Sequence, residues 1–260
     1  MVYPIRVNNL NWSFNDNKIL TNITTKISNN SFTCIIGPNG SGKSTFLKGI
    51  LKILPPKQNT IHIENEDITK LNYRELSKKI ASVPQNTTVD YDFSVMDIVL
   101  MGRSPYIKRF QAEKENDFEI AKQAMEMTST WHLKDRNINS LSGGERQRVI
   151  ISRALAQQSN ILVLDEPISH LDIHHQVEVL NITKELCTTK NFTVIAVLHD
   201  LNLAIQYSDY LILINKGHIV AEGSPEKVVT KENIKNVYSI DICMITNPVT
   251  GKPHIIPITK

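Results

Sequence analysis

The sequence predicts an α/β fold in which helices cover a largely parallel sheet and a helical subdomain is inserted into that core. Three observations support this prediction. Apolar runs of strand length recur at both ends of the chain, the region between them has helical periodicity, and a glycine-rich loop joins one such run to a helical segment. With 260 residues, 41% of them hydrophobic, the chain can bury the core of one large domain.

Short apolar runs predict the strands. They lie at residues 5–7, 23–27, 32–36, 60–63, 161–164 and 194–198. The last two runs contain too many adjacent apolar residues to alternate between a buried and an exposed face. Such runs are typical of parallel strands that are covered on both sides by helices.

Helical periodicity predicts the inserted subdomain between about residues 89 and 160. The apolar residues that recur there are Val95, Ile98, Val99, Ala121, Ala124 and Met125. We therefore expect one domain over residues 1–260. Its predicted parts are an α/β core (1–88 and 160–225), a helical subdomain (89–159) and a C-terminal segment (226–260).

Composition excludes several classes of protein. The net charge of +3 is small and the basic residues are dispersed, so we expect no nucleic-acid partner. Cys34, Cys187 and Cys243 are far apart, which favours a reducing cytoplasm over a disulfide framework or a thiolate metal site. The apolar stretches have strand length and the first residues lack a signal core, so we expect the chain itself not to span a membrane.

Residues 37–45 form a complete phosphate-binding loop pattern, G-P-N-G-S-G-K-S-T. Glycines let phosphate approach backbone N–H groups, and the following helix adds the positive end of its dipole. Lys43 supplies a charge for the β and γ phosphates, and Ser44 a hydroxyl for Mg²⁺. We expect ATP and Mg²⁺ as cofactors. The predicted nucleotide contacts in this loop are Gly37, Pro38, Asn39, Gly40, Ser41, Gly42, Lys43, Ser44 and Thr45.

A pair of acidic residues directly follows the apolar run 161–164. Asp165 is positioned to complete the Mg²⁺ site, and Glu166 to polarise the attacking water as a general base. The alternative is a pair of solvated acids at the end of a strand. The phosphate loop earlier in the chain favours the catalytic interpretation.

The segment 141–148 reads L-S-G-G-E-R-Q-R. Ser142 with Glu145 three residues later forms a capping box, which predicts the start of a helix. That local interpretation explains only the cap. Together with the loop and the acidic pair, the segment resembles the signature motif of ATP-binding cassette (ABC) ATPases, and the resemblance covers essentially the full length.

The resemblance implies a phosphate-loop (RecA-like) NTPase core with an antiparallel β subdomain, and it implies roles for further residues. Phe14 stands where an aromatic residue stacks on adenine, with Trp12 nearby as a competing choice. Gln85 matches the glutamine loop, which contacts Mg²⁺ and links it to the helical subdomain, and His199 matches the switch histidine. The implied catalytic residues are Glu166, His199, Gln85 and Lys43, and the implied metal ligands are Ser44, Gln85 and Asp165.

The family resemblance also implies a head-to-tail dimer with a second copy of the chain. Residues 169–172 match the family's D-loop. Ser142, Gly143, Gly144 and Asp172 would then contact the nucleotide held by the partner. ATP binding would close the dimer, and loss of the γ-phosphate would open it.

Residues 92–106 and 250–253 resemble ATPases that serve ferric siderophore, haem and cobalamin importers. The resemblance implies a peripheral protein at the cytoplasmic face of the membrane, working with permease subunits and indirectly with a substrate-binding protein. We expect a ferric siderophore as cargo, with haem or cobalamin as alternatives. Residues 90–110 are the expected permease groove, with Val95, Ile98, Val99 and Met101 as core and contact positions.

Other interpretations are less favoured. A non-transport cassette acting on DNA or ribosomes is disfavoured because the chain lacks a long coiled coil and a second cassette. A degenerate cassette would lack the general base or the switch histidine, which are both present here as Glu166 and His199. His170, His174 and His175 do not match the H-E-x-x-H zinc pattern, and residues 90–93 fit the start of the helical subdomain better than a cation site.

Overall fold

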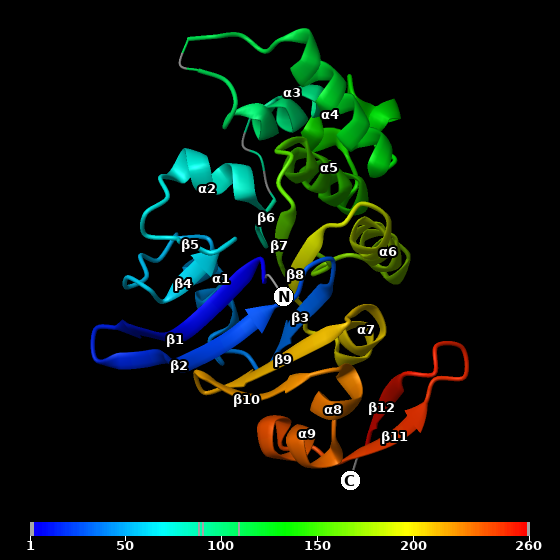
Figure 1. Cartoon of the computed structure of the whole chain (residues 1–260). Helices are drawn as coiled ribbons and strands as arrows, with labels where there is room; N and C mark the ends of the chain where they lie inside the picture. Colours follow the sequence, from blue (N-terminus) through cyan, green and yellow to red (C-terminus); the bar gives the residue numbers. More distant parts are fainter. Residues whose placement is uncertain (1–2, 88, 90, 109, 259–260) are drawn as a thin grey trace. The chain divides into compact units, whose positions relative to one another are not determined.

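The computed structural model of the chain describes residues 3–87, 89, 91–108 and 110–258. These form two compact units, which Figure 1 shows in sequence colours: Met1–Lys70 with Asn191–Lys260, and Leu71–Lys190. The predicted subdomain boundaries differ from this division and stay a prediction. Asp90, the first residue of the segment expected to begin the helical subdomain, lies outside the described residues.

An antiparallel sheet begins the first unit. Its strands are β1 (Ile5–Phe14), β2 (Asn17–Ile27), β4 (Ile61–Ile63) and β5 (Glu66–Asp67), in the order β2-β1-β4-β5. All three pairings are antiparallel. β1 and β2 are longer than the apolar runs predicted, because their pairing continues through mostly exposed residues to the connecting turn, where Phe14 is opposite Asn17.

The parallel strands of the first unit position the phosphate loop. β3 (Phe32–Ile36) pairs in parallel with β8 (Thr193–Val197) and with β9 (Tyr210–Asn215). Every residue of β3 and β8 is buried, as predicted for strands covered on both faces. β10 (His218–Gly223) adds an antiparallel edge to β9. The helices α1 (Lys43–Ile50) and α7 (Leu201–Tyr207) follow β3 and β8 along the chain.

The C-terminal segment is the last part of the first unit along the chain. It contains α8 (Pro225–Val228), α9 (Lys231–Tyr238) and a hairpin of β11 (Ile242–Thr246) and β12 (Pro253–Pro257). The hairpin is tied to α7, since the Asn202 side chain exchanges two hydrogen bonds with the backbone of Ile255. The Lys252 ammonium donates to carbonyl groups at the end of α7, which favours a cation.

The second unit combines two parallel strands with a group of helices. The strands β6 (Ile80–Val83) and β7 (Ile161–Asp165) are parallel. The α-helices are α2 (Tyr73–Lys79), α3 (Val95–Leu100), α4 (Glu115–Met127), α5 (Gly143–Ala156) and α6 (Ile173–Thr189). Three short 3₁₀ helices are η1 (Met101–Arg103), η2 (Trp131–Leu133) and η3 (Ile138–Ser140).

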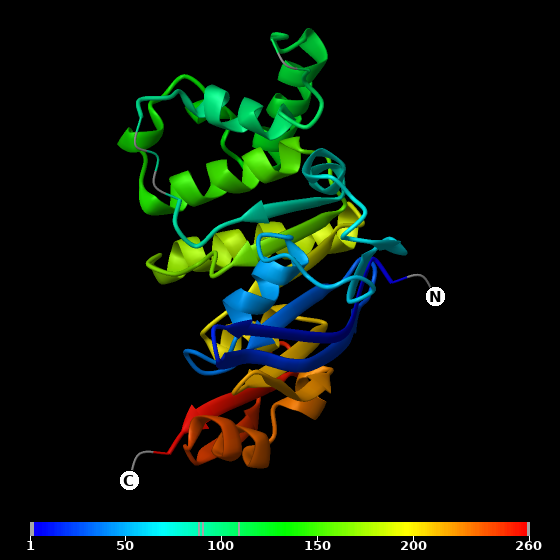
Figure 2. The ribbon, with the colours of Figure 1, turned by 90° about the vertical axis from the view of Figure 1, so that its left-hand side faces the viewer.

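The predicted helical periodicity is confirmed by α3 and α4. All six apolar residues that predicted these helices are buried in them. Figure 2 shows α3, α4 and α5 stacked as the green layer, with α3 and α4 each packed against α5. Helices therefore surround a common apolar core in this part of the chain.

A buried ion pair joins η1 to α4. The Arg103 Nε donates to Asp117 Oδ1 over 2.9 Å, and both side chains are at most 10% exposed. Arg103 Nη1 also donates to the Ala156 carbonyl and to Gln158 Oε1. The backbone N–H of Lys114 and the Arg103 guanidinium together hold the pKa of Asp117 below its ordinary value. The charge of Arg103 is therefore neutralised where it is buried.

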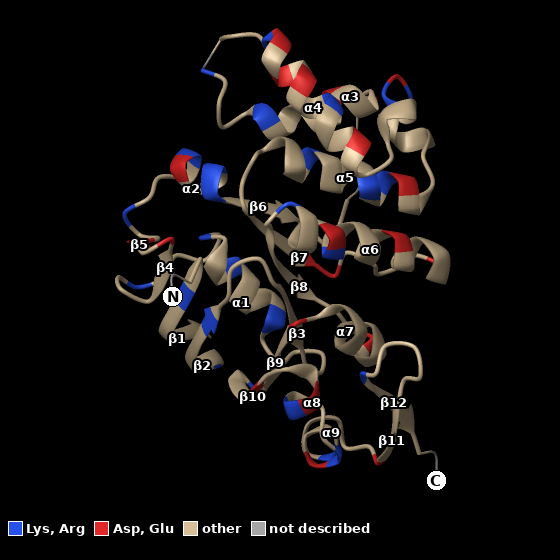
Figure 3. Cartoon of the chain, turned by 45° about the vertical axis from the view of Figure 1, so that its right-hand side comes forward, with Lys and Arg blue, Asp and Glu red and all other residues tan. Residues whose placement is uncertain are grey.

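Charged residues of both signs are interspersed along the helices and strands (Figure 3). None of the helices in the described residues combines the length and the apolar character needed to span a lipid bilayer.

Candidate functional site: the phosphate loop and the signature helix

The phosphate loop has a backbone that only glycine adopts easily. Gly37, Gly40 and Gly42 have φ angles of 152°, 76° and 108°. A Cβ on Gly37 would collide with the Ile214 carbonyl oxygen of β9, and one on Gly42 would lie 2.7 Å from Leu20 Cδ2. The loop is therefore shaped by backbone packing against β2 and β9.

Lys43 and Ser41 complete a cradle for an anion. The Lys43 side chain is 5% exposed, and its ammonium donates to the carbonyl oxygens of Gly37 and Pro38, each over 2.9 Å. Ser41 Oγ is buried without a hydrogen-bond partner among the described residues. Gly42, as the N-cap residue of α1, has no side chain to cap that helix. A cation, an unsatisfied hydroxyl and the start of a helix fit the phosphates of a nucleotide.

His199 lies at the same edge of the first unit as the phosphate loop. It follows β8 and is exposed, and the loop follows β3. The two strands are parallel and in register, with Ile35 opposite Val197. Their carboxyl ends therefore bring His199 to the edge that holds the loop, and its contact with a γ-phosphate stays a prediction.

The two candidates for adenine stacking differ in exposure. Phe14 ends β1 and is 57% exposed, and its ring meets Trp12 edge-on with centroids 6.3 Å apart. Trp12 is half-buried, and its Nε1 has no hydrogen-bond partner within the described part of the chain. Phe14 therefore has the more exposed ring face of the two, and its stacking on adenine stays a prediction.

Tyr238 is a contact of the phosphate loop that the sequence patterns did not indicate. It ends α9 in the C-terminal segment, and its hydroxyl faces the backbone of Gly37. Burial raises the pKa of the Tyr238 phenol, so the group stays neutral at physiological pH. No short-range pattern marks this residue, because it lies far from the loop in sequence.

In the second unit, the structure brings Gln85 and Glu166 together. β6 and β7 are parallel, with Val83 opposite Leu164, so the residues that follow them share one edge. Gln85 Nε2 donates to Glu166 Oε2 over 2.6 Å. Glu166 also has a φ of 52°, a left-handed backbone that costs about 1 kcal/mol or more for such a residue and is concentrated at functional sites. Asp165 precedes it as the last residue of β7.

The signature segment begins α5 with the predicted capping box. Glu145 N donates to Ser142 Oγ over 3.3 Å, and the Ser142 backbone N–H and hydroxyl both donate to Glu145 Oε2, over 2.8 and 2.9 Å. These bonds, with the charge of Arg136, hold the pKa of Glu145 below its ordinary value. Ser142 and Gly143 are exposed, so the start of α5 is accessible to a ligand.

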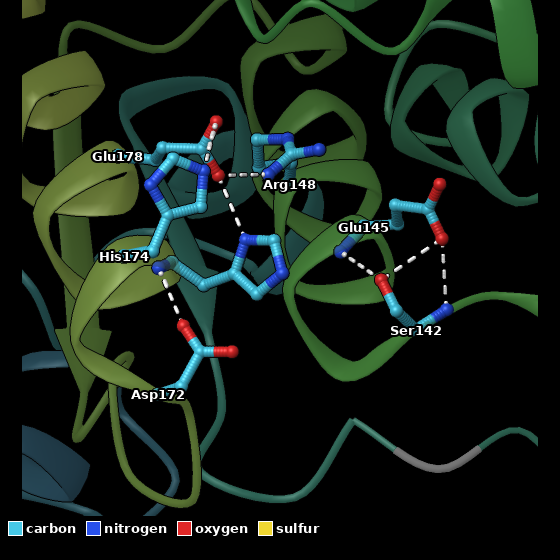
Figure 4. A network of polar contacts seen from close by, with 7 residues as sticks. Ser142, Glu145, Arg148, Asp172, His174 and Glu178 are labelled. Carbon is cyan, nitrogen blue, oxygen red and sulfur yellow. Dashed lines mark hydrogen bonds and ion pairs between the residues drawn. The ribbon is translucent and has the colours of Figure 1, made fainter.

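Asp172 is the N-cap residue of α6, as Ser142 is of α5. Its Oδ1 accepts from the His175 backbone N–H over 3.0 Å, which caps the helix and holds the pKa of Asp172 below its ordinary value. Figure 4 shows Asp172 and Ser142 together with three nearby polar residues, His174, Glu178 and Arg148. The two predicted trans-acting segments thus begin two neighbouring helices.

Fold and loop geometry define a nucleotide-binding α/β protein of the phosphate-loop class. Residues 20–169 match the family described as ABC transporter. The chain belongs to this family and is an ATPase of the ATP-binding cassette class.

Individual relatives agree with that assignment. The chain is 37% identical to the ferric enterobactin transport ATP-binding protein FepC of Escherichia coli, covering 100% of this chain and 96% of that protein. It is 38% identical to the hemin import ATP-binding protein HmuV of Hahella chejuensis, covering 91% and 93%. The ADP conformation of MJ1267, an ATP-binding cassette of an ABC transporter, matches with a TM-score of 0.81 at 28% identity, covering 92% and 98%. The dimeric MJ0796 cassette matches with a TM-score of 0.73 at 28% identity, covering 85% and 98%.

Proposed function

We propose that this chain hydrolyses ATP with Mg²⁺ to power an importer of ferric siderophore. Relatives named for ferric enterobactin, petrobactin and iron(3+)-hydroxamate transport support this cargo. Other relatives are named for hemin and cobalamin import, so these are the second candidates. Selection of the cargo would rest with the permease and a substrate-binding protein on other chains.

The oxygen donors of the chain fit Mg²⁺. Ser44 offers a hydroxyl, Asp165 a carboxylate and Gln85 an amide oxygen, which are the hard ligands that this ion prefers. Bound Mg²⁺ would neutralise charge on the β and γ phosphates. The Gln85 amide nitrogen is already directed to Glu166, which leaves its oxygen for the ion.

The hydrogen bond between Gln85 and Glu166 is the observation that carries the hydrolytic role. It orients the Glu166 carboxylate, which accepts the proton of the attacking water as general base. His199 orients that water and contacts the γ-phosphate from the edge of the first unit. Lys43 binds the phosphates, since its bonds to the carbonyl oxygens of Gly37 and Pro38 hold its ammonium in the loop.

The signature segment acts on the nucleotide of a second copy. The hydroxyl of Ser142 and the N–H groups of Gly143 and Gly144 would donate to the γ-phosphate held by the partner, with Asp172 beside them. A dimer of the related MJ0796 cassette supports this arrangement. ATP then acts as the bridge that closes the two copies.

We propose that the permease contact lies within the segment 90–110, of which Asp90 and Arg109 lie outside the described residues. Val95, Ile98 and Val99 are buried and belong to the core of the second unit, whereas Met101 is 41% exposed. Met101 is thus the member of the predicted set that can touch a permease helix. This contact places the chain at the cytoplasmic face of the membrane, as a peripheral subunit.

Replacing Glu166 with Gln tests the hydrolytic role. We expect hydrolysis to slow by about 10²- to 10⁴-fold, because the general base is lost, while ATP affinity is retained. Phosphate release and equilibrium ATP titration measure the two quantities. Glu119→Gln, an exposed residue of α4, is the matched control and should retain wild-type turnover. Wild-type turnover in Glu166→Gln would remove Glu166 from this role.

Uptake in cells tests the transport role. Cells that lack this chain should lose uptake of labelled ferric siderophore and regain it with the wild-type gene, but not with Glu166→Gln. Parallel assays with haem and cobalamin distinguish the second candidates. Undiminished uptake of all three cargoes would contradict the importer assignment.

A further inference from the structure

We propose that His175 is a positioning residue that sets the spacing between the start of the signature helix α5 and the start of α6. Through this spacing, Ser142–Gly144 and Asp172 would meet the partner's nucleotide together. The inference rests on the proposed trans contact. It assigns a role to a residue that the mechanism above does not use.

The His175 ring lies directly on the backbone of α5. A Cβ built on Gly144 would lie only 2.6 Å from both Cδ2 and Nδ1 of His175. Gly144 is buried, so a larger residue there could not turn its side chain to solvent. The absent side chain of Gly144 therefore makes room for the imidazole, and the two helices interlock at this point.

A carboxylate holds the ring in this place. His175 Nδ1 lies 2.8 Å from Glu178 Oε2, and the same oxygen accepts from Arg148 Nη1 over 2.6 Å. Arg148 is on α5, one helical turn after Gly144, and its side chain is 11% exposed. Glu178 thus ties the ring on α6 to a cation on α5, and charge-assisted bonds of this kind are short and directional.

The backbone of His175 fixes the other trans-acting segment. Its N–H is the donor that Asp172 Oδ1 accepts at the start of α6. One residue therefore contacts both segments, with its ring against Gly144 and its N–H bonded to Asp172. A displacement of His175 would move both segments relative to each other.

A metal site is the competing use of these side chains. Ligand atoms of His174, His175 and Glu178 lie within 4.8 Å of one another. However, the guanidinium of Arg148 already contacts Glu178, and a fixed cation there opposes the binding of a second one. The His174 side chain is 76% exposed and lies 3.7 Å from Glu178, whereas the His175 side chain is 25% exposed and its ring lies against Gly144. These contacts favour a positioning role for His175 over a metal site.

Turnover and ATP-driven dimerisation of the purified full-length chain test the proposal. His175→Ala should lower kcat by about 10- to 100-fold, since a displacement of about 1 Å can cost that much. Nucleotide affinity of the monomer should stay within about twofold of wild type, because the phosphate loop is untouched. His175→Asn keeps an N–H donor near the position of Nδ1 and should recover most of the lost turnover.

His174→Ala is the matched control. It removes the same side chain one residue earlier, from an exposed position, and should leave turnover at the wild-type level. If His175→Ala does not fold, His175→Leu replaces it. Leucine fills the space against Gly144 without a ring nitrogen, so it should keep thermal stability and lose turnover. Wild-type turnover of the folded alanine or leucine variant would overturn the proposal, as would a His175→Asn variant with no recovery.

Ser142→Ala separates this proposal from the proposed function. If it lowers dimerisation and turnover while the His175 variants do not, the trans contact stands and the positioning role fails. If Ser142→Ala leaves dimerisation and turnover unchanged, the trans contact itself fails and the positioning role fails with it. Reduced turnover in both variants, with His174→Ala unaffected, supports both.

Discussion

The two units each hold a buried cation, and they hold it by different means. In the first unit, Lys43 donates to the backbone carbonyls of Gly37 and Pro38. In the second, Arg103 is bonded to the carboxylate of Asp117 and to two neutral acceptors. A neutral carbonyl oxygen fixes the direction of an N–H donor, whereas a carboxylate also neutralises the cation that it binds.

This difference suggests that the charge of Lys43 serves ligand binding, whereas the charge of Arg103 serves the stability of the fold. The charge of Lys43 is held in place for phosphate, so its removal should affect the ligand more than the fold. The charge of Arg103 is used within the second unit, so loss of its partner should affect the fold more than the ligand.

Removing the Asp117 carboxylate should have the largest effect. Asp117→Ala leaves the Arg103 charge buried without its counter-ion and removes the acceptor of the Lys114 N–H, which should cost about 3–5 kcal/mol of unfolding free energy. Urea denaturation measures this loss. The control is Asp241→Ala, whose ion pair with Lys235 is exposed and should contribute only about 0–1 kcal/mol. Equal losses in both variants would contradict the distinction between the two environments.

Removing the Lys43 ammonium should have the second-largest effect. Lys43→Ala should weaken ATP binding by about 1.5–3 kcal/mol, or about 10- to 150-fold, because a charged hydrogen-bond donor to phosphate is lost. Titration with labelled ATP measures this. Lys48→Ala makes the same change at an exposed position of α1 and should leave affinity unchanged. Affinity that falls equally in both variants would point to net charge and not to the cradle.

The pH dependence of the unfolding free energy tests the ion pair of Arg103 with Asp117. The pKa of Asp117 lies below its ordinary value of 3.8, so the folded state stays ionised after the unfolded state begins to bind a proton. The stability contributed by Asp117 is therefore complete above pH 3.8 and is lost as pH falls through the folded pKa, with a slope of up to about 1.4 kcal/mol per pH unit. Denaturation curves of wild type and Asp117→Asn below pH 4.5 should show the smaller slope in the variant. Parallel slopes would exclude Asp117 as the source.

The sequence predicted those parts of the site that are encoded locally. The glycines, Lys43 and Ser44 lie within one nine-residue pattern, and the capping box of Ser142 and Glu145 spans a single helical turn. Buried strands β3, β7 and β8 were predicted because their apolar runs are continuous. The catalytic roles of these residues remain predictions.

Contacts between distant segments could not be predicted in this way. Arg148 and Glu178 are 30 residues apart, and nothing in either local pattern indicates their ion pair. The approach of Tyr238 to Gly37 depends on how α9 packs in the first unit. The interlock of Gly144 with His175 likewise depends on how two helices meet, which periodicity within each helix does not determine.

A glycine outside the phosphate loop gives the smallest predicted effect. Gly49 is in α1, and an added Cβ would make ordinary contacts, at 3.5 Å from Leu10 Cδ2 and 3.7 Å from Ile61 Cδ1. Gly49→Ala should therefore stabilise the chain by about 0.5–1 kcal/mol, because alanine loses less backbone entropy on folding. Gly102→Ala in η1 should have the opposite sign, since its Cβ would collide with the Arg153 carbonyl. Thermal denaturation of both variants tests whether glycine is required by close packing or only tolerated.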